Sequence, residues 1–422
     1  MISNVSTPLI GVVDTMIIGQ TPNPSLIGAV AISALIFTFI YWAFGFLRMG
    51  TTGLAAQAIG ANDDEEVKAT LGRSLFLAVI IGGLLITLQY PIRLLTFNFI
   101  ETSTEVEELA RRYFDIRIFS APATLTNYAL LGWLIAIGKT REALAIQLLL
   151  NISNIMLDVL FVLIFEMGVS GVALGTLLSE YLAAAVGLYI AWTIRLKKSG
   201  WWDLQLVINR TKLIRSLSVN TDIMMRSLAL LIIFSWFTIA SAKFDDTTLA
   251  ANAVLLHFLS VSAYFLDGIA FATEKFIGES TGKKSRQMFD QTIKITTLWA
   301  VLFATFISGS LLLIGPNIID LLTVDEGTRV LAKRYVIYAS IAPLIGVWCF
   351  QLDGIFIGAT ATATMRNSMF ISTLLFFLTY FALRDFENLG LWIAFLSHFV
   401  YRAVTLALRL PIARQGLTSN EG

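Results

Sequence analysis

The sequence has little charge for its length and almost no cysteine or histidine. Of its 422 residues, 14% are charged and 56% are hydrophobic, whereas a soluble domain is about 25% charged. The single cysteine, Cys349, excludes an internal disulfide and a metal or redox centre built on several cysteines. The net charge of +1 provides no bulk attraction to nucleic acid. These shortages argue against a soluble, secreted or nucleic-acid-binding protein.

Long uncharged hydrophobic segments are abundant, and the mean hydropathy is +0.76. Two examples are Thr15–Leu47 and Ile295–Asn317, and such runs approach or exceed the ~18 apolar residues that mark a membrane helix. Met1 has no basic flank, so we expect the first segment to be a true span and not a cleavable signal peptide. We predict twelve transmembrane helices, near residues 2–19, 28–58, 72–95, 114–137, 142–166, 171–194, 219–242, 248–278, 290–316, 332–358, 365–383 and 389–412.

The two halves of the chain repeat each other. The run Gly50–Gly60 has a counterpart in Gly268–Gly278, and the pair Ala121–Pro122 recurs as Ala342–Pro343 at nearly the same offset. A duplicated hydrophobic chain is typical of secondary transporters, in which the substrate path lies between the halves. We therefore predict an all-α integral membrane protein, with two six-helix lobes related by a pseudo-two-fold axis along the membrane normal.

The predicted lobes are residues 1–195 and 217–422, joined by a linker at 196–216. Basic residues gather in and beside this linker, namely Arg195, Lys197, Lys198, Arg210, Lys212 and Arg215. Because positive loops stay in the cytoplasm, we expect the linker and both termini to be cytoplasmic, in the inner membrane of a prokaryote. The tryptophans of the linker fit an interfacial helix, and a plain connection fits them equally well.

Polar residues inside the first predicted span stand out. A carboxylate at bilayer depth costs about 2.5–3.5 kcal/mol, and Asp14 lies six residues after Pro8. Pro8 removes a backbone hydrogen bond and allows the helix to bend, so protonation of Asp14 could be coupled to helix shape. The alternative is that Asp14 lies near the end of a short span and is simply hydrated.

The fifth predicted span carries a polar stripe on one face. Its members, spaced by 4, 3 and 4 residues, are Gln147, Asn151, Asn154 and Asp158. Such a stripe cannot face lipid, so it lines a cavity or bonds neighbouring helices. Asn127 and Thr176 could supply further oxygen atoms. Together with Asp14, the oxygens of Asn154, Asp158 and Thr176 suit a proton or a small cation such as Na⁺, with Asp14 and Asp158 as its acids.

The second half has polar positions of its own on predicted spans 8 and 10. With Asn127, Gln147 and Asn151 from the first half, they are our candidates for a substrate cavity: His257, Tyr264, Asp267, Gln351 and Asp353. The chain has neither an HExxH nor a GxSxG motif, and neither histidine has a serine or cysteine partner in the sequence. We therefore expect no enzymatic activity, no cofactor and no dedicated metal centre.

Two local patterns have structural interpretations. Asp222 and Arg226 are four residues apart on predicted span 7, which favours an ion pair within the helix. Gly171 and Gly175 form a GxxxG pattern at the start of span 6. This pattern favours close helix packing over a ligand-binding role.

Several ordered motifs together resemble the multidrug and toxic compound extrusion (MATE) family. They are Ser6–Thr15 with Pro8 and Asp14, the Gly50–Gly60 run, Asn151-x-x-Asn154-x-x-x-Asp158, and Met167–Gly171. Gln351–Gly358 and Asp267 followed by glycine indicate the DinF-like branch of that family. The resemblance covers essentially the whole chain.

The resemblance implies two six-helix lobes around a V-shaped cleft and export of organic cations and other amphipathic compounds, driven by proton or sodium entry. Asp14 matches the family's first-helix acid that is central to coupling, and Asn154, Asp158 and Thr176 match its N-lobe polar cluster. Some relatives place a cation site in the C-lobe, where Asp267 and Asp353 are the candidates.

We favour a proton-coupled, monomeric antiporter of drug-like molecules that works by alternating access. Sodium coupling would use the same oxygen atoms. A lipid-linked oligosaccharide flippase of the same superfamily is another alternative, and it would favour a strongly cationic cavity. A membrane sensor or scaffold would not need polar stripes in both halves.

Overall fold

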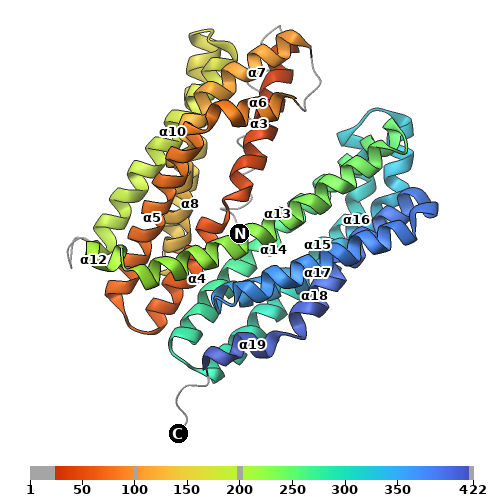
Figure 1. Ribbon diagram of the computed structural model, residues 1–422. Helices are drawn as coiled ribbons and strands as arrows, with labels where there is room; N and C mark the ends of the chain where they lie inside the picture. Colours follow the sequence, from red (N-terminus) through yellow and green to blue (C-terminus); the bar gives the residue numbers. More distant parts are fainter. Residues whose placement is uncertain (1–23, 99–102, 197–202, 418–422) are drawn as a thin grey trace. The chain divides into compact units, whose positions relative to one another are not determined.

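The computed structural model describes residues 24–98, 103–196 and 203–417, and these ranges contain helices and no strand. Ten described helical segments are long and apolar enough to cross a membrane, and α17 (Thr362–Ala382) is a further helix of 21 residues. The predicted all-α membrane architecture is confirmed (Figure 1). The predicted span 2–19, with Pro8 and Asp14, lies outside the described residues.

The chain divides into two compact units. The N-terminal unit comprises residues up to 55 together with 63–217. Its helices are α3 (Pro24–Ala43), α4 (Phe46–Gly60, up to Ala55), α5 (Asp64–Thr87), α6 (Gln89–Asn98), α7 (Thr104–Arg117), the 3₁₀ turn η1 (Ile118–Ser120), α8 (Ala121–Ala136), α9 (Thr140–Asp158), the π-helix η2 (Val159–Ile164), α10 (Gly168–Ala191), η3 (Trp192–Leu196) and α12 (Leu204–Val207). Helix α10 contacts α7, α8 and α9, so it is central to this unit.

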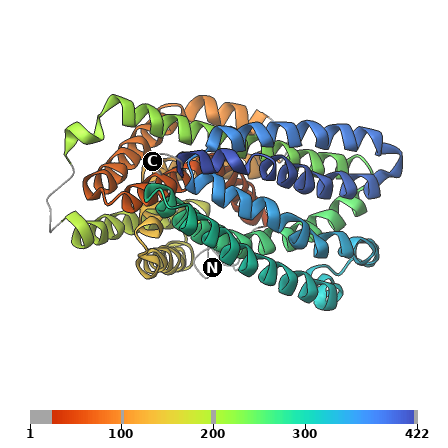
Figure 2. The same cartoon turned by 90° about the horizontal axis from the view of Figure 1, so that it is seen from below.

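The C-terminal unit comprises residues 56–62 and 218 onwards. Its helices are α13 (Arg210–Ala242, from Ser218), α14 (Asp246–Gly282), α15 (Arg286–Leu322), α16 (Glu326–Gly358), α17, η4 (Arg384–Phe386), α18 (Glu387–Ala407), α19 (Leu410–Arg414) and η5 (Gln415–Leu417). Helix α16 packs against α14, α15 and α18, and α17 packs against α18. The two views show these long helices running beside one another (Figure 1 and Figure 2).

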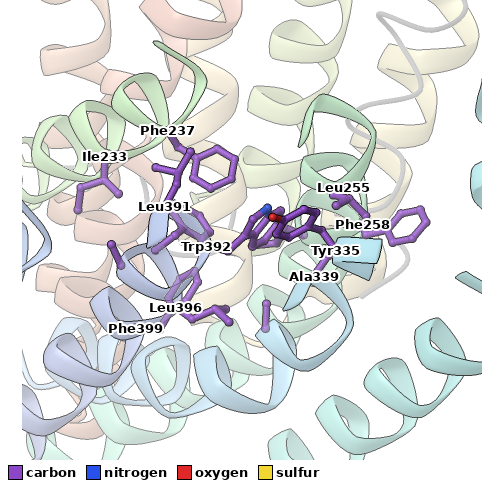
Figure 3. Close-up of a cluster of buried hydrophobic side chains, with 14 of the residues drawn as sticks. Ile233, Phe237, Leu255, Phe258, Tyr335, Ala339, Leu391, Trp392, Leu396 and Phe399 are labelled. Atoms are coloured by element: carbon purple, nitrogen blue, oxygen red, sulfur yellow. The ribbon is translucent and has the colours of Figure 1, made fainter. Parts of the chain in front are cut away.

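An aromatic core holds the C-terminal unit together. Phe237 of α13 meets Trp392 of α18 edge-on, with ring centroids 5.0 Å apart, and both side chains are fully buried. Leu391 and Leu255 lie in the same core (Figure 3). The Trp392 indole N–H donates to Asn252 Oδ1 at 2.9 Å, which satisfies the polar end of a buried ring.

Gly60 of the first repeated run and Gly282, just after the second, allow two backbones to touch within the C-terminal unit. A Cβ on Gly60 would lie 2.1 Å from the carbonyl oxygen of Glu279, and one on Gly282 would lie 2.0 Å from that of Gln57. Gln57 Nε2 also donates to the carbonyl oxygen of Gly358 at 3.0 Å. The end of α4 is therefore fixed against α14 and α16, which explains why residues 56–62 group with the second half.

Several helices begin earlier than the predicted spans. The fourth span, predicted from 114, belongs to a helical segment that starts at Thr104, and the seventh, predicted from 219, starts at Arg210. Pairs such as Glu107–Arg111, at 2.7 Å, stabilise the added turns. Hydrophobicity marks only the part of a helix in the hydrocarbon, so ion-paired ends escape it.

Acidic caps begin two helices of the C-terminal unit outside the membrane-spanning segments. Asp245 accepts hydrogen bonds from the Thr248 hydroxyl and N–H, each at 2.7 Å, and these bonds lower the pKa of its carboxyl. The Thr328 N–H bonds Asp325 at 2.7 Å and lowers its pKa in the same way. Each carboxylate satisfies a backbone donor that the helix itself leaves unpaired.

Replacing Gly282 by alanine should destabilise the protein by about 1–3 kcal/mol, because the new methyl group would force apart two backbones that cannot yield. The matched control is Gly309→Ala on α15, where a Cβ meets nothing within 4 Å and the better helix former should gain up to about 1 kcal/mol. Thermal unfolding of the purified proteins in detergent measures both changes. Equal melting temperatures for the two variants would contradict the close approach.

Candidate functional site

The N-terminal unit holds a buried cluster of three polar side chains. Asn154 and Asp158 come from α9 and Thr176 from α10, and none of the three is more than 1% exposed. Asn154 Nδ2 donates to Asp158 Oδ2 at 3.1 Å and lies 3.3 Å from Thr176 Oγ1. The structure thus brings together three of the four predicted coupling residues, while the fourth, Asp14, lies outside the described ranges.

The backbone around Asp158 is shaped to admit its carboxylate. A Cβ on Gly175 would lie 2.1 Å from Asp158 Oδ1, so only glycine leaves this oxygen its place. Asp158 is also the last α-helical residue before the π-helix Val159–Ile164, and Gly171 packs against Phe161 of that segment. Short π-helical turns are frequent at functional sites, although this unit has a second one, Trp192–Leu196. The GxxxG pattern therefore serves packing and, through Gly175, the placement of the acid.

The other candidates of the first half have different positions. Asn151 is buried on α9 and Gln147 is half-buried one turn before it. Asn127 of α8 donates through Nδ2 to Glu180 of α10, at 2.8 Å to Oε2 and 3.1 Å to the carbonyl oxygen. Asn127 thus belongs to a second polar group and not to the Asp158 cluster.

Glu180 is the functional candidate that the sequence interpretation missed. It is buried, and it lies four residues after Thr176 on α10. Tyr41 interacts electrostatically with Glu180. Its hydroxyl oxygen lies 3.0 Å from that of Ser120, although the two residues are far apart in the sequence. The signal that could have revealed it is a lone acid in the apolar run of α10, since an ionisable residue within a membrane span indicates function by default.

In the C-terminal unit, Asp353 of α16 is held by two arginines. Arg226 of α13 and Arg402 of α18 both donate through Nη2 to the same oxygen, Oδ2. All three side chains are at most 9% exposed. A single carboxylate shared by two guanidinium groups leaves no negative charge over for a bound cation.

The predicted ion pair between Asp222 and Arg226 is wrong. Asp222 pairs instead with Arg366 of α17, at 2.5 Å, and accepts a hydrogen bond from the Thr362 hydroxyl at 3.0 Å. Arg226 points to Asp353 on another helix. Asp222 and Asp353 are equally buried, at 5% exposed, so the choice of partner follows from the side chains that neighbouring helices bring to each acid and not from the i,i+4 spacing.

The remaining candidates of the second half lie on α14 and α16 and differ in burial. Gln351 is buried and accepts from Thr273 Oγ1 at 3.1 Å. Asp267 and Tyr264 are half-buried on α14, where Asp267 interacts electrostatically with Arg226, and His257 is exposed on the same helix. In the described ranges, no three histidine, cysteine or acidic side chains lie together in a way that could hold a metal ion.

Comparison with known proteins places these features in a family. The family model MatE matches residues 1–160 and again 222–381, once in each half, in agreement with the repeat. The chain is 38% identical over 405 residues to DNA damage-inducible protein F of Escherichia coli K12, covering 96% of this chain and 88% of that protein. It is 25% identical over 416 residues to a protein of Listeria monocytogenes named "Probable multidrug resistance protein NorM", covering 96% and 91%.

Solved structures share the fold. A MOP superfamily transporter from Pyrococcus furiosus matches with a TM-score of 0.87 at 19% identity, over 99% of this chain and 95% of that one. A multidrug resistance MATE family transporter in an outward-facing conformation matches with a TM-score of 0.86 at 19% identity, over 100% and 94%. The helices, the repeated match and the DinF-like relative lead to one conclusion: the chain belongs to the MATE family of multi-pass membrane transporters.

Proposed function

We propose that this protein is a proton-coupled multidrug antiporter of the bacterial inner membrane, which exports organic cations and other amphipathic compounds by alternating access. Family membership and relatives that are named as multidrug resistance proteins support export of small molecules. The observation that carries the proposal is the buried, hydrogen-bonded Asn154–Asp158–Thr176 cluster in the N-terminal unit.

A proton suits this cluster better than a sodium ion does. Sodium needs several oxygen ligands around one point. Here the amide nitrogen of Asn154, which cannot bind a cation, faces both Asp158 and Thr176. The Thr176 hydroxyl donates to the Val172 carbonyl at 2.9 Å. A proton needs only one oxygen of the Asp158 carboxylate and no such set of ligands around one point.

Proton binding at Asp158 would change its partners. The ionised carboxylate accepts a hydrogen bond from Asn154, and a proton would turn one of its oxygens from an acceptor into a donor. We infer that protonation, shared with Asp14 of the first helix, lets that helix bend near Pro8 and reduces the substrate volume. Release of the proton to the cytoplasm would then restore the substrate-binding form.

Asp158→Asn should abolish dye export driven by a proton gradient, because an amide cannot carry the exchangeable proton. Efflux of the cationic dye ethidium from energised membrane vesicles, first under a proton gradient and then under a sodium gradient, measures this. Asp14→Asn should behave alike, and Glu142→Gln, which removes a peripheral acid paired with Lys139, should export at the wild-type rate. Export by the wild type under sodium alone would refute proton coupling.

Gly175→Ala should impair transport while every acid remains in place. The new Cβ would occupy the position of Asp158 Oδ1, so the carboxylate must leave its pocket and its bond to Asn154. The matched control is Gly83→Ala on α5, where a Cβ meets nothing within 4 Å. Gradient-driven efflux, normalised to the amount of folded protein, should fall in the first variant only, and equal efflux in both would show that Asp158 placement is unimportant.

Asp353→Asn should act on stability and not on ion choice. It leaves Arg226 and Arg402 buried without their carboxylate, which costs about 3–5 kcal/mol when one partner of a buried ion pair is removed. Adding Arg402→Leu should recover part of this loss. Thermal unfolding in equal concentrations of sodium and choline chloride tests the idea, and a sodium-specific stabilisation that Asp353→Asn removes would instead identify a cation site.

A further inference from the structure

Helix α10 carries two polar positions on one face. Thr176 belongs to the Asp158 cluster, and Glu180 follows four residues later. Residues four apart on a helix lie one above the other, with a rise of about 6 Å. The Asp158 cluster uses the first position, whereas the buried acid at the second position has no part in that cluster.

Neutral donors hold the carboxylate of Glu180. Asn127 Nδ2 donates two hydrogen bonds to this residue, at 2.8 Å to Oε2 and 3.1 Å to the carbonyl oxygen. The Thr124 hydroxyl is a further hydrogen-bond partner. Within the described ranges, the buried Oδ1 of Asn127 has no hydrogen-bond partner. The amide oxygen of Asn127 is therefore available to accept a hydrogen bond beside the carboxyl group of Glu180.

A series of hydroxyl groups leads away from Glu180. Thr124 Oγ1 lies 3.5 Å from Ser120 Oγ, and Ser120 Oγ lies 3.0 Å from the Tyr41 hydroxyl of α3. All three side chains are at least nine-tenths buried. Each hydroxyl can both donate and accept, so the series can pass a proton, whereas a hydrated ion would have to displace closely packed side chains.

The charged and titratable neighbours of the acid come from three surrounding helices. Arg117 of α7, Tyr128 of α8 and Tyr41 of α3 all interact electrostatically with Glu180. Arg117 bonds Tyr113 and lies 5.6 Å from the ring centroid of Phe37. Among the described ion pairs, none joins Arg117 to Glu180. The guanidinium group therefore balances the charge of the acid without a described direct bond, and the hydrogen bonds to its oxygens come from neutral side chains.

We propose that Glu180 is a second proton-binding residue of the N-terminal unit, one helical turn from the Asp158 cluster and reached through Thr124, Ser120 and Tyr41. The carboxylate would take up one proton to become a carboxylic acid and return it later in the cycle, with no change of electrons. This inference rests on the proposed proton-coupled export and adds a site to it.

The test counts protons released when substrate binds. Purified protein in weakly buffered detergent solution is mixed with ethidium, and a pH-indicator dye reports the proton release while ethidium fluorescence reports binding. Glu180→Gln preserves the acceptor for Asn127 but cannot ionise, so it should bind ethidium, release about one proton fewer per molecule, and show a flatter dependence of affinity on pH. Glu142→Gln is the matched control and should equal the wild type.

A second variant separates the relay from the acid and also covers the case in which Glu180→Gln does not fold. Ser120→Ala with Thr124→Val keeps Glu180 but interrupts the hydroxyl series, so the number of released protons should stay unchanged while their release in stopped-flow slows by about tenfold or more, the effect of about 1.4 kcal/mol in a barrier. Release at the wild-type rate would overturn the relay.

The outcomes distinguish this inference from the proposed function. If Glu180→Gln releases as many protons as the wild type with the same pH dependence, Glu180 is only a structural link between α8 and α10. If the wild type releases no proton on ethidium binding and exports no dye under a proton gradient, proton-coupled export itself fails. If Glu180→Gln and Asp158→Asn each release about one proton fewer than the wild type but still release the remainder, the two acids are separate proton-binding sites.

Discussion

A charged or polar side chain in the hydrocarbon layer needs its partner inside the protein, because lipid offers none. This constraint orders both halves of the molecule. Asp158 is enclosed by Asn154 and the bare backbone of Gly175, and Glu180 by Asn127. The helices that supply these partners can therefore shift against one another only as far as the hydrogen bonds between them remain formed. The aromatic and aliphatic packing around them therefore serves to hold polar atoms at bonding distance, as well as to exclude lipid.

Glycine residues allow the close approaches of helices that this constraint requires. At Gly60 and Gly282 the absence of a Cβ brings one helix onto the carbonyl oxygens of another, and at Gly175 it gives a carboxylate oxygen its space. In lipid, where helices gain little from hydrophobic attraction, such close packing is a main source of association. The repeated glycine run is thus a packing device, and only Gly175 connects glycine directly to the proposed chemistry.

The sequence was informative where one helix carries the whole signal. The stripe on α9 was readable because its spacing matches the helical repeat, and the structure joins Asn154 and Asp158 across one turn with Thr176. Interactions between helices were not readable. Asp222 and Arg226 have the spacing of a pair, yet their partners lie 144 and 127 residues away. Glu180 was missed for the same reason, since its partner Asn127 is 53 residues away on another helix. The starts of helices were predicted too late in the sequence, because ion-paired turns before the apolar run carry no hydrophobic signal.

The repeat duplicates the helices but not their polar contents. Among the described hydrogen bonds, the acids of the N-terminal unit accept from amides and hydroxyls, which can bond either the charged or the neutral form of a carboxyl group, while Arg117 interacts with Glu180 only electrostatically. The C-terminal unit faces Asp353 with two guanidinium groups, which remain charged and oppose protonation of the carboxylate between them. A proton that must bind and leave in every cycle is better served by the first environment, while a permanent ion pair suits a unit that keeps its internal packing.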